Sequence, residues 1–159
     1  MEIRNETADD ERAIHAVVAD AFGRRDEADL VDHLRRDGVL VISMVAENDG
    51  RLCAHVALSR LVSPPHALAL APVSVITGSQ NRGIGTRLVS RAIERARTEN
   101  EDMIFVLGHR DYYQRFGFSA KAAADFPSGY AGPNFMALHL SDKVTRPAQV
   151  IYAPAFDQL

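Results

Sequence analysis

The chain has 159 residues, of which 47% are hydrophobic and 25% are charged, a length and composition typical of one globular domain. This composition excludes disordered and collagen-like proteins. Its 18 Lys and Arg residues against 21 Asp and Glu residues give a net charge of −3, which provides no general attraction to nucleic acid or to an anionic membrane. We therefore expect a single domain over residues 1–159, with neither of those partners.

The positions of the apolar residues, the cysteine and the histidines exclude further classes of protein. The longest mostly apolar run, residues 68–76, is far shorter than the roughly 18 residues of a membrane span. Residues 1–6 lack the basic start and apolar block of a secretory signal, which favours the cytoplasm. Cys53 is the single cysteine and can supply at most one thiolate to a metal. No metal site is expected, because four of the histidines show no ligand spacing: His15, His33, His66 and His139.

The first half of the chain predicts one strand, two helices and a hairpin. Residues 2–5 alternate as a strand does, and apolar residues at helical spacing predict helices that end near Phe22 and over residues 27–36. Two apolar, β-branched runs, residues 40–46 and 52–58, are joined by Asn48-Asp49-Gly50, a strong hairpin-turn signal. Residues 63–66 contain two prolines and predict a loop.

The second half predicts a strand, a long helix and further strands. Residues 68–76 favour a buried strand, in which Pro72 removes a backbone donor and predicts a bulge. After a turn, a helix begins at Gly83 and carries an apolar stripe as far as Ala96. The remaining segments are predicted as a strand (103–107), a short helix (111–115) that stops at Gly117, an extended piece from Phe118, a loop (125–134), a strand (135–140) and an edge strand (150–152).

This order of elements predicts an α/β fold. Antiparallel pairing is expected in the first half of the sheet, and a strand–helix–strand crossover in the second half.

The most informative segment, residues 73–88, passes from a strand through a tight turn into an amphipathic helix. Free N–H groups at a helix N-terminus attract anions, and Gly83 and Gly85 have no side chains that would keep a phosphate away. The alternative is that both glycines only allow close packing of the helix on the sheet. A dinucleotide-binding Gly-x-Gly-x-x-Gly does not fit because Leu88 takes the last position, and no Gly-Lys-Ser/Thr loop is present.

The sequence Gln80-Asn81-Arg82-Gly83-Ile84-Gly85 resembles the Gln/Arg-x-x-Gly-x-Gly/Ala signature of the GCN5-related N-acetyltransferase (GNAT) superfamily. About thirty residues downstream, Tyr113-Gln114-Arg115-Phe116-Gly117-Phe118 is similar to the Tyr-x-x-x-Gly-Phe element of that family. The likeness extends over nearly the whole chain and looks closest to the YhbS-like branch. It implies a mostly antiparallel mixed sheet of six to seven strands, splayed at the fourth and fifth strands and flanked by about four helices.

The resemblance also implies acetyl-CoA as the cosubstrate. Backbone groups around Val73, Val75 and Ile76 would then pair with the pantetheine arm. The pyrophosphate would be held by N–H groups of Gln80, Asn81, Arg82, Gly83, Ile84, Gly85 and Thr86, with added charge from Arg82 and Arg87. The distortion expected at Pro72 is compatible with the splayed strands of the family.

Tyr113 matches the usual general acid of the family. Its ordinary pKa of about 10 is close enough to that of a thiol, about 8.5, for proton donation to the departing CoA thiolate. The competing interpretation is that Tyr112, Tyr113, Phe116 and Phe118 only form an aromatic cover for the sheet. Because a lysine-like amine is almost fully protonated at pH 7, a base or a water relay should help, with Glu27, His55 and His109 as candidates. His109 is attractive because it follows a strand end.

The resemblance implies an N-acetyltransferase in which an amine attacks the thioester directly in a ternary complex, with the oxyanion stabilised near Val75. Two alternatives stay open: a noncatalytic acyl-CoA-binding module, and a binder of another nucleotide. Either a small amine or a protein could be the acceptor, and either a monomer or a homodimer is possible. Two positions depart from the family pattern, because Thr77 stands where many members have proline and the segment at Gly108 lacks a common asparagine.

Overall fold

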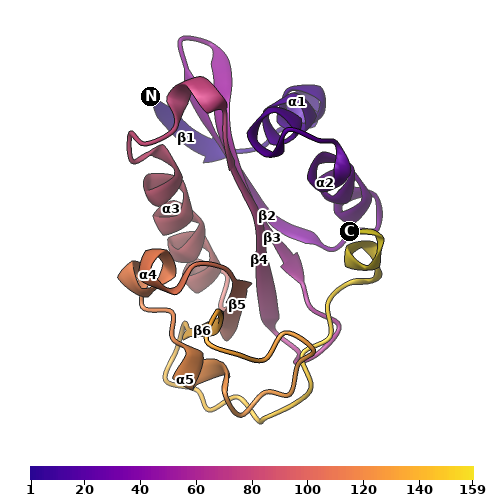
Figure 1. The fold of residues 1–159 in the computed structure, drawn as a ribbon, viewed down its shortest axis with the longest axis vertical. Helices are drawn as coiled ribbons and strands as arrows, with labels where there is room; N and C mark the ends of the chain where they lie inside the picture. The colour runs from indigo at the N-terminus through magenta and orange to yellow at the C-terminus, as the bar shows by residue number, and fades with distance from the viewer.

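The computed structural model describes residues Met1–Leu159, and its centre is one six-stranded sheet in the order β1-β2-β3-β4-β5-β6 (Figure 1). Strands β4 and β5 are parallel, and every other neighbouring pair is antiparallel. This mixed sheet confirms the predicted α/β class. The strands are β1 (Glu2–Asn5), β2 (Leu40–Asn48), β3 (Arg51–Arg60), β4 (Ala67–Val75), β5 (Met103–Leu107) and β6 (Phe135–His139).

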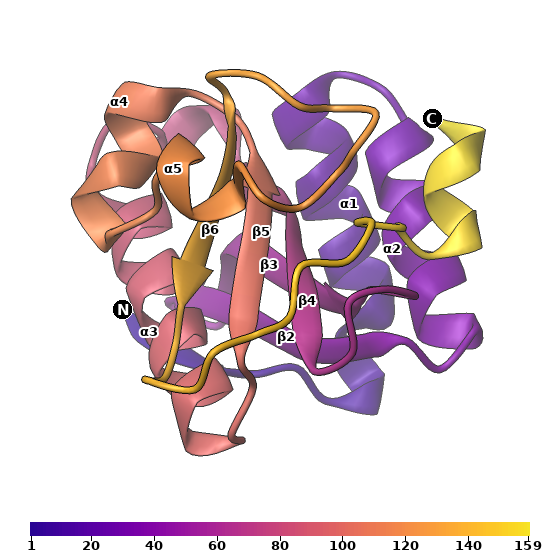
Figure 2. The same cartoon turned by 90° about the horizontal axis from the view of Figure 1, so that it is seen from below.

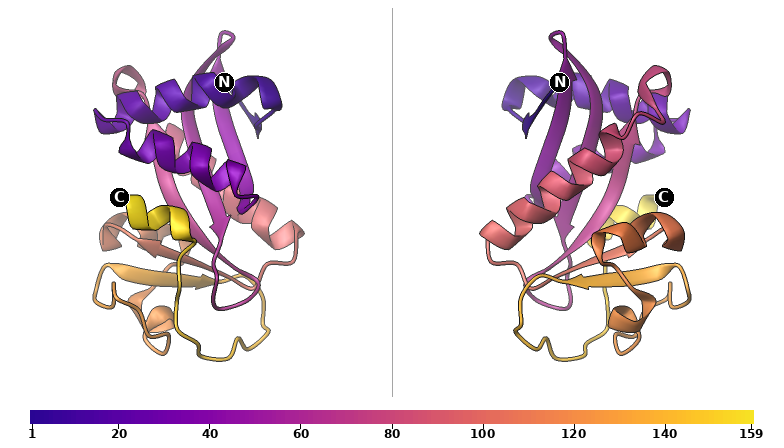
Figure 3. Two further views of the ribbon diagram at one scale, coloured as in Figure 1. Left: turned by 90° about the vertical axis from the view of Figure 1, so that its right-hand side faces the viewer. Right: turned by 90° about the vertical axis from the view of Figure 1, so that its left-hand side faces the viewer.

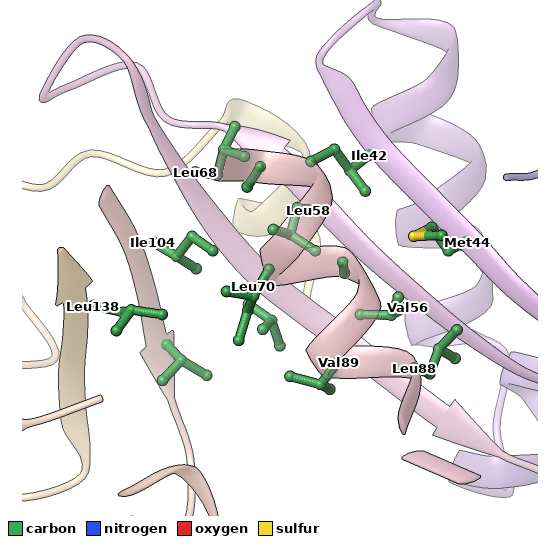
Figure 4. Packing of buried hydrophobic residues seen from close by; sticks show 14 of the residues in the cluster. Ile42, Met44, Val56, Leu58, Leu68, Leu70, Leu88, Val89, Ile104 and Leu138 are labelled. Carbon is green, nitrogen blue, oxygen red and sulfur yellow. The ribbon is translucent and has the colours of Figure 1, made fainter. Parts of the chain in front are cut away.

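Helices cover both faces of the sheet. Helices α1 (Glu11–Phe22) and α2 (Asp26–Arg36) lie on one face and α3 (Ile84–Thr98) lies on the other, as Figures 2 and 3 show. Two short helices, α4 (Arg110–Tyr113) and α5 (Ala120–Ala123), follow β5. On the α3 face, Leu88 and Val89 pack with side chains of the strands in the largest core cluster (Figure 4). Short 3-10 helices complete the chain: η1 (Ala8–Asp10), η2 (Thr77–Ser79), η3 (Gln114–Phe116) and η4 (Pro154–Gln158).

The bulge predicted at Pro72 is present in β4. Val56 of β3 pairs with Val73, but Leu58 pairs with Leu70, so β4 contains one residue more than β3 between these pairs. The additional residue reverses the alternation of side chains along β4. As a result Leu70 and Val73 both pack on the α3 face, although three positions separate them.

Strands β4 and β5 separate soon after they meet, which confirms the predicted splay. Their parallel ladder has three pairs: Ala67 with Met103, Leu68 with Ile104, and Ala69 with Phe105. Strand β4 continues to Val75 without a neighbour on that side, while β5 and β6 turn away from β2, β3 and β4 (Figure 3). The second half of β4 therefore has an open edge.

Two extended segments predicted in the C-terminal part are each reduced to a single bridge. Residues after Phe118 form only a single bridge, Ser119 with Ala137, before α5 begins, because the side chain of Ser119 caps that helix. Ile151 likewise forms one bridge, with Ser63, in place of an edge strand. The sheet has six strands as a result, at the lower end of the expected range. None of the helices combines the length and the apolar character that a bilayer-spanning helix needs.

Candidate functional site

A cavity of about 590 Å³ lies where the open edge of β4 meets the N-terminus of α3. Its walls come from the end of α1, from β4, from the turn before α3 and from the α4 region. The lining residues are Ala21, Phe22, Val73, Val75, Ser79, Gln80, Asn81, Gly83, Ile84, Gly85, Thr86, Tyr112 and Arg115.

The open edge of β4 offers backbone groups to this cavity. The N–H of Ile76 donates to the carbonyl of Cys53 at 2.9 Å, so this residue bonds toward β3. Because hydrogen bonding alternates along an antiparallel strand, the backbone groups of Val73 and Val75 point the other way, toward the splay. The Gln80 side chain donates to the Val75 carbonyl at 3.0 Å, which leaves the N–H of Val75 and both groups of Val73 for a ligand.

The N-terminus of α3 supplies the second set of donors. Gly83 is the N-cap residue in a left-handed conformation, with φ of 79°, and no side chain caps the helix. The first N–H with a partner inside the helix is that of Arg87, which donates to the Gly83 carbonyl at 3.1 Å. The N–H groups of Ile84, Gly85 and Thr86 thus remain free at the positive end of a 15-residue helix. This arrangement suits a phosphate.

The space above Gly85 is open only because the residue lacks a side chain. A Cβ atom there would lie 3.4 Å from Val75 Cγ2 and 3.7 Å from the Tyr112 hydroxyl. It would therefore fill the passage between the helix N-terminus and the edge of β4. The donors and this passage fit a ligand with a pyrophosphate at one end and an amide-containing arm at the other.

Tyr112 and Arg115 form the outer wall of the cavity. The Tyr112 hydroxyl lies 3.1 Å from Thr86 Oγ1, and the Arg115 guanidinium stacks 4.5 Å from the centre of the Tyr112 ring. Sequence reasoning missed both residues as part of the site, although they belong to the segment that carries the second motif. It also missed Phe22, which no sequence signal connects with this cavity.

Eight of the ten residues predicted to bind acetyl-CoA line the cavity, and Ile76 and Arg82 do not. Ile76 contributes to a different cavity on the other side of the turn, and its N–H is already bonded to β3. Arg82 is exposed in the turn before α3, and Arg87 is exposed in the first turns of that helix. Neither arginine forms an ion pair, so both charges are free near the helix N-terminus.

Comparison with known proteins identifies the family. Residues 3–118 match the sequence profile of the Acetyltransferase (GNAT) family. The chain belongs to this family. The uncharacterized N-acetyltransferase YjhQ of Escherichia coli is 35% identical over 127 residues, which cover 76% of this chain and 68% of YjhQ. The uncharacterized N-acetyltransferase YhbS of E. coli is 30% identical over 136 residues, with 83% and 81% covered.

Solved structures of GNAT proteins share the whole fold. A GNAT acetyltransferase of Brucella melitensis in complex with acetyl-CoA is 30% identical, with a TM-score of 0.85, and the match covers 98% of this chain and 97% of that one. E. coli YhbS in complex with CoA is 28% identical, with a TM-score of 0.89 over 98% and 91%. The predicted family and its YhbS-like character are therefore confirmed.

Tyr113 lies deeper than the cavity wall in this GNAT chain. Its ring packs against Gly108 and, edge to face, against Phe118 with ring centres 5.8 Å apart. Burial raises the pKa of the Tyr113 hydroxyl to about 12, which is a larger mismatch with a thiol than the sequence alone indicated. A thiolate in the same apolar surroundings would also have a raised pKa, because burial disfavours its charge. The aromatic cluster that was the competing interpretation is present as well.

The three candidate bases lie in different surroundings. Glu27 is buried, and its hydrogen bond with Arg24, 2.8 Å between Nε and Oε1, lowers the pKa of the carboxyl group, which makes it a poor base. His55 is completely buried within the sheet. His109 is exposed at the N-cap of α4, where its carbonyl accepts the N–H groups of Tyr112 and Tyr113 at 3.1 Å each.

The surroundings of His55 fix its tautomer. Ser43 Oγ lies between the Glu6 carboxylate and His55 Nε2, the latter at 2.8 Å. Because a carboxylate can only accept, Ser43 donates to Glu6 and accepts a hydrogen bond from His55 Nε2. His55 Nδ1 is then an unprotonated, buried nitrogen without a partner, and burial lowers the pKa of the imidazole to about 4. His55 is a neutral residue of the interior.

The helices α1 and α2 also bring together three side chains whose spacing in the sequence gave no signal. Ligand atoms of His15, Asp29 and Asp32 lie within 4.8 Å of one another. His15 Nδ1 is 2.8 Å from Asp32, and Arg35 Nη1 donates to the other oxygen of that carboxylate at 3.2 Å. The same arginine also donates to both carboxylate oxygens of Glu6, at 2.9 Å and 2.8 Å, so its charge is shared between the two carboxylates.

Proposed function

We propose that this chain is an acetyl-CoA-dependent N-acetyltransferase, in which a primary amine attacks the thioester directly in a ternary complex. The observation that carries the proposal is one cavity that joins the open edge of β4 to the uncapped N-terminus of α3. Two similar GNAT structures support the cosubstrate, since one protein is in complex with acetyl-CoA and the other with CoA.

Each set of donors has a distinct task in this proposal. The free N–H groups of α3 hold the pyrophosphate, and the exposed charges of Arg82 and Arg87 add attraction for it. Backbone groups of Val73 and Val75 pair with the pantetheine arm, and one of their N–H groups stabilises the negative charge that develops on the thioester oxygen. The chain's contribution is therefore positioning and electrostatic stabilisation.

Proton transfer completes the reaction. Tyr113 stays protonated at every physiological pH because its pKa is about 12, so it can hold a proton for the departing sulfur. Of the three candidate bases, His109 is the one that is exposed and forms no ion pair. We propose that it accepts the proton of the amine, directly or through water.

A calorimetric titration with acetyl-CoA, CoA, ATP and NAD tests the proposal. Binding of the two CoA ligands alone is expected, followed by acetyl transfer in a screen of small amines and peptide N-termini. Binding of CoA without turnover on any amine would favour the noncatalytic module. Equal competition by ATP or NAD would favour a binder of another nucleotide.

The variant Gly85→Asp locates the binding site. It places a carboxylate in the passage between Val75 and Tyr112, so we expect acetyl-CoA affinity to fall at least about tenfold. Gly129→Asp is the matched control, because a Cβ at Gly129 meets nothing within 4 Å and the added charge lies outside the cavity. Equal affinities of the two variants would show that the pyrophosphate binds elsewhere.

A further inference from the structure

The turn between β4 and α3 is held from behind by α1. The backbone N–H of Thr77 donates to Oδ2 of Asp20, near the C-terminal end of α1, at 2.8 Å. The two residues are 57 positions apart in the sequence. On the other side of the turn, Ser79 and Gln80 line the candidate acetyl-CoA cavity. Thr77 and Asp20 line the different cavity to which Ile76 contributes.

This hydrogen bond holds a segment that has few other restraints. The 3-10 turn η2 has three residues, none of them buried, and its own N-cap residue, Ile76, forms no side-chain capping bond. The turn leads directly to the free N–H groups of α3. A shift of η2 would therefore move Gln80 and the residues after it, which line the cavity and lead into the N-terminus of α3.

We propose that Asp20 is a positioning residue of the acetyl-CoA site. It fixes the turn through Thr77 and so aligns the donors that meet the pyrophosphate. The same helix end places Phe22, two residues later, in the wall of that cavity, so α1 contacts the site from two directions. This inference rests on the proposed function, because it assigns a role toward acetyl-CoA.

The backbone at Thr77 allows a sharp test. Ile76 has φ of −57° and ψ of 147°, which is the conformation that a following proline favours. Thr77 is the first residue of η2, a position where proline is tolerated because its missing N–H is not needed inside the helix. Thr77→Pro therefore removes the donor to Asp20 and, by fixing φ, supplies a restraint of its own.

The experiment compares CoA affinity in the unaltered protein, Asp20→Ala, Asp20→Asn, Thr77→Pro and the double variant Asp20→Ala/Thr77→Pro. Asp20→Ala should weaken CoA binding about fivefold, as expected for the loss of one exposed hydrogen bond of ordinary strength. Asp20→Asn should keep the affinity because its amide oxygen still accepts the bond. Thr77→Pro should also keep it, and Asp20→Ala should have no effect in the Thr77→Pro background.

Two further measurements separate positioning from other effects. Pantetheine lacks the pyrophosphate, so its binding at millimolar concentration should not change in Asp20→Ala. Asp125→Ala, which removes an exposed carboxylate that forms no ion pair, should leave CoA affinity unchanged. If Asp20→Ala lowered CoA affinity as much in the Thr77→Pro background as in the unaltered protein, or did not lower it at all, the role of Asp20 would be excluded. The proposed function would still stand. Absence of CoA binding by the unaltered protein would overturn the proposed function and this inference with it.

Discussion

The ring of Tyr113 lies so close to Gly108 that a Cβ atom at Gly108 would come within 2.5 Å of Tyr113 Cε2. Gly108 does not have a positive φ, so its backbone alone would accept a side chain. Position 108 must lack a side chain because the ring of Tyr113 occupies that space. The contact with Gly108, at the end of β5, therefore fixes the orientation of the Tyr113 ring at the end of α4.

Gly108→Ala should therefore reduce turnover through Tyr113. The added methyl group displaces the ring, and we expect kcat to fall at least about tenfold, with acetyl-CoA affinity within about twofold of the unaltered value. Steady-state kinetics and calorimetry measure the two effects separately. Tyr113→Phe should give the same pattern, and Gly129→Ala, where nothing lies within 4 Å, should be neutral. Full turnover in both Gly108→Ala and Tyr113→Phe would remove Tyr113 from the mechanism.

The neighbouring Tyr112 should show the opposite pattern. Tyr112→Phe keeps the ring on which Arg115 stacks but removes the hydroxyl that meets Thr86 in the first turn of α3. We expect acetyl-CoA affinity to fall about threefold to fivefold while kcat at saturation stays unchanged. Thr86→Val should have a similar effect. The double variant should bind acetyl-CoA little more weakly than either single variant, because both substitutions remove the same hydrogen bond. A loss of kcat without a loss of affinity would contradict this assignment.

Features of the fold that depend on a few neighbouring residues could be predicted from the sequence. Pro72 cannot donate to a ladder, and the structure has the bulge there; Asn48-Asp49-Gly50 predicted the hairpin of β2 and β3. The motif glycines marked the uncapped start of α3, because free N–H groups and missing side chains can be inferred from residue types alone.

Contacts between distant segments could not be predicted in the same way. Asp20 and Thr77 meet because α1 crosses the end of β4, and nothing in either segment indicates the other. The contribution of Phe22 to the cavity has the same origin. Ile151 looked like part of a strand, but its neighbours pack on α2 through Ala153 and Phe156, which leaves one bridge in place of a ladder.

Burial of His55 makes the stability of the protein depend on pH in a defined window. The pKa of His55 is about 4 in the folded protein and about 6.5 in an unfolded chain, so between these values the unfolded chain binds more protons. The free energy of unfolding should therefore fall as the pH is lowered from about 6.5 to about 4. One proton gives a limit of about 1.4 kcal/mol per pH unit.

Urea unfolding at a series of pH values between about 7 and about 4.5 measures this dependence. His55→Gln lacks the titrating group, and its amide can still donate to Ser43, so its unfolding free energy should be lower at neutral pH but much less dependent on pH. His139→Gln is the control, because His139 is exposed and its removal should leave the full dependence. The carboxyl group of Asp10, with a pKa of about 2, affects stability mainly below this window. If His55→Gln lost stability as steeply as the unaltered protein across this window, His55 would not be the buried neutral group that the structure shows.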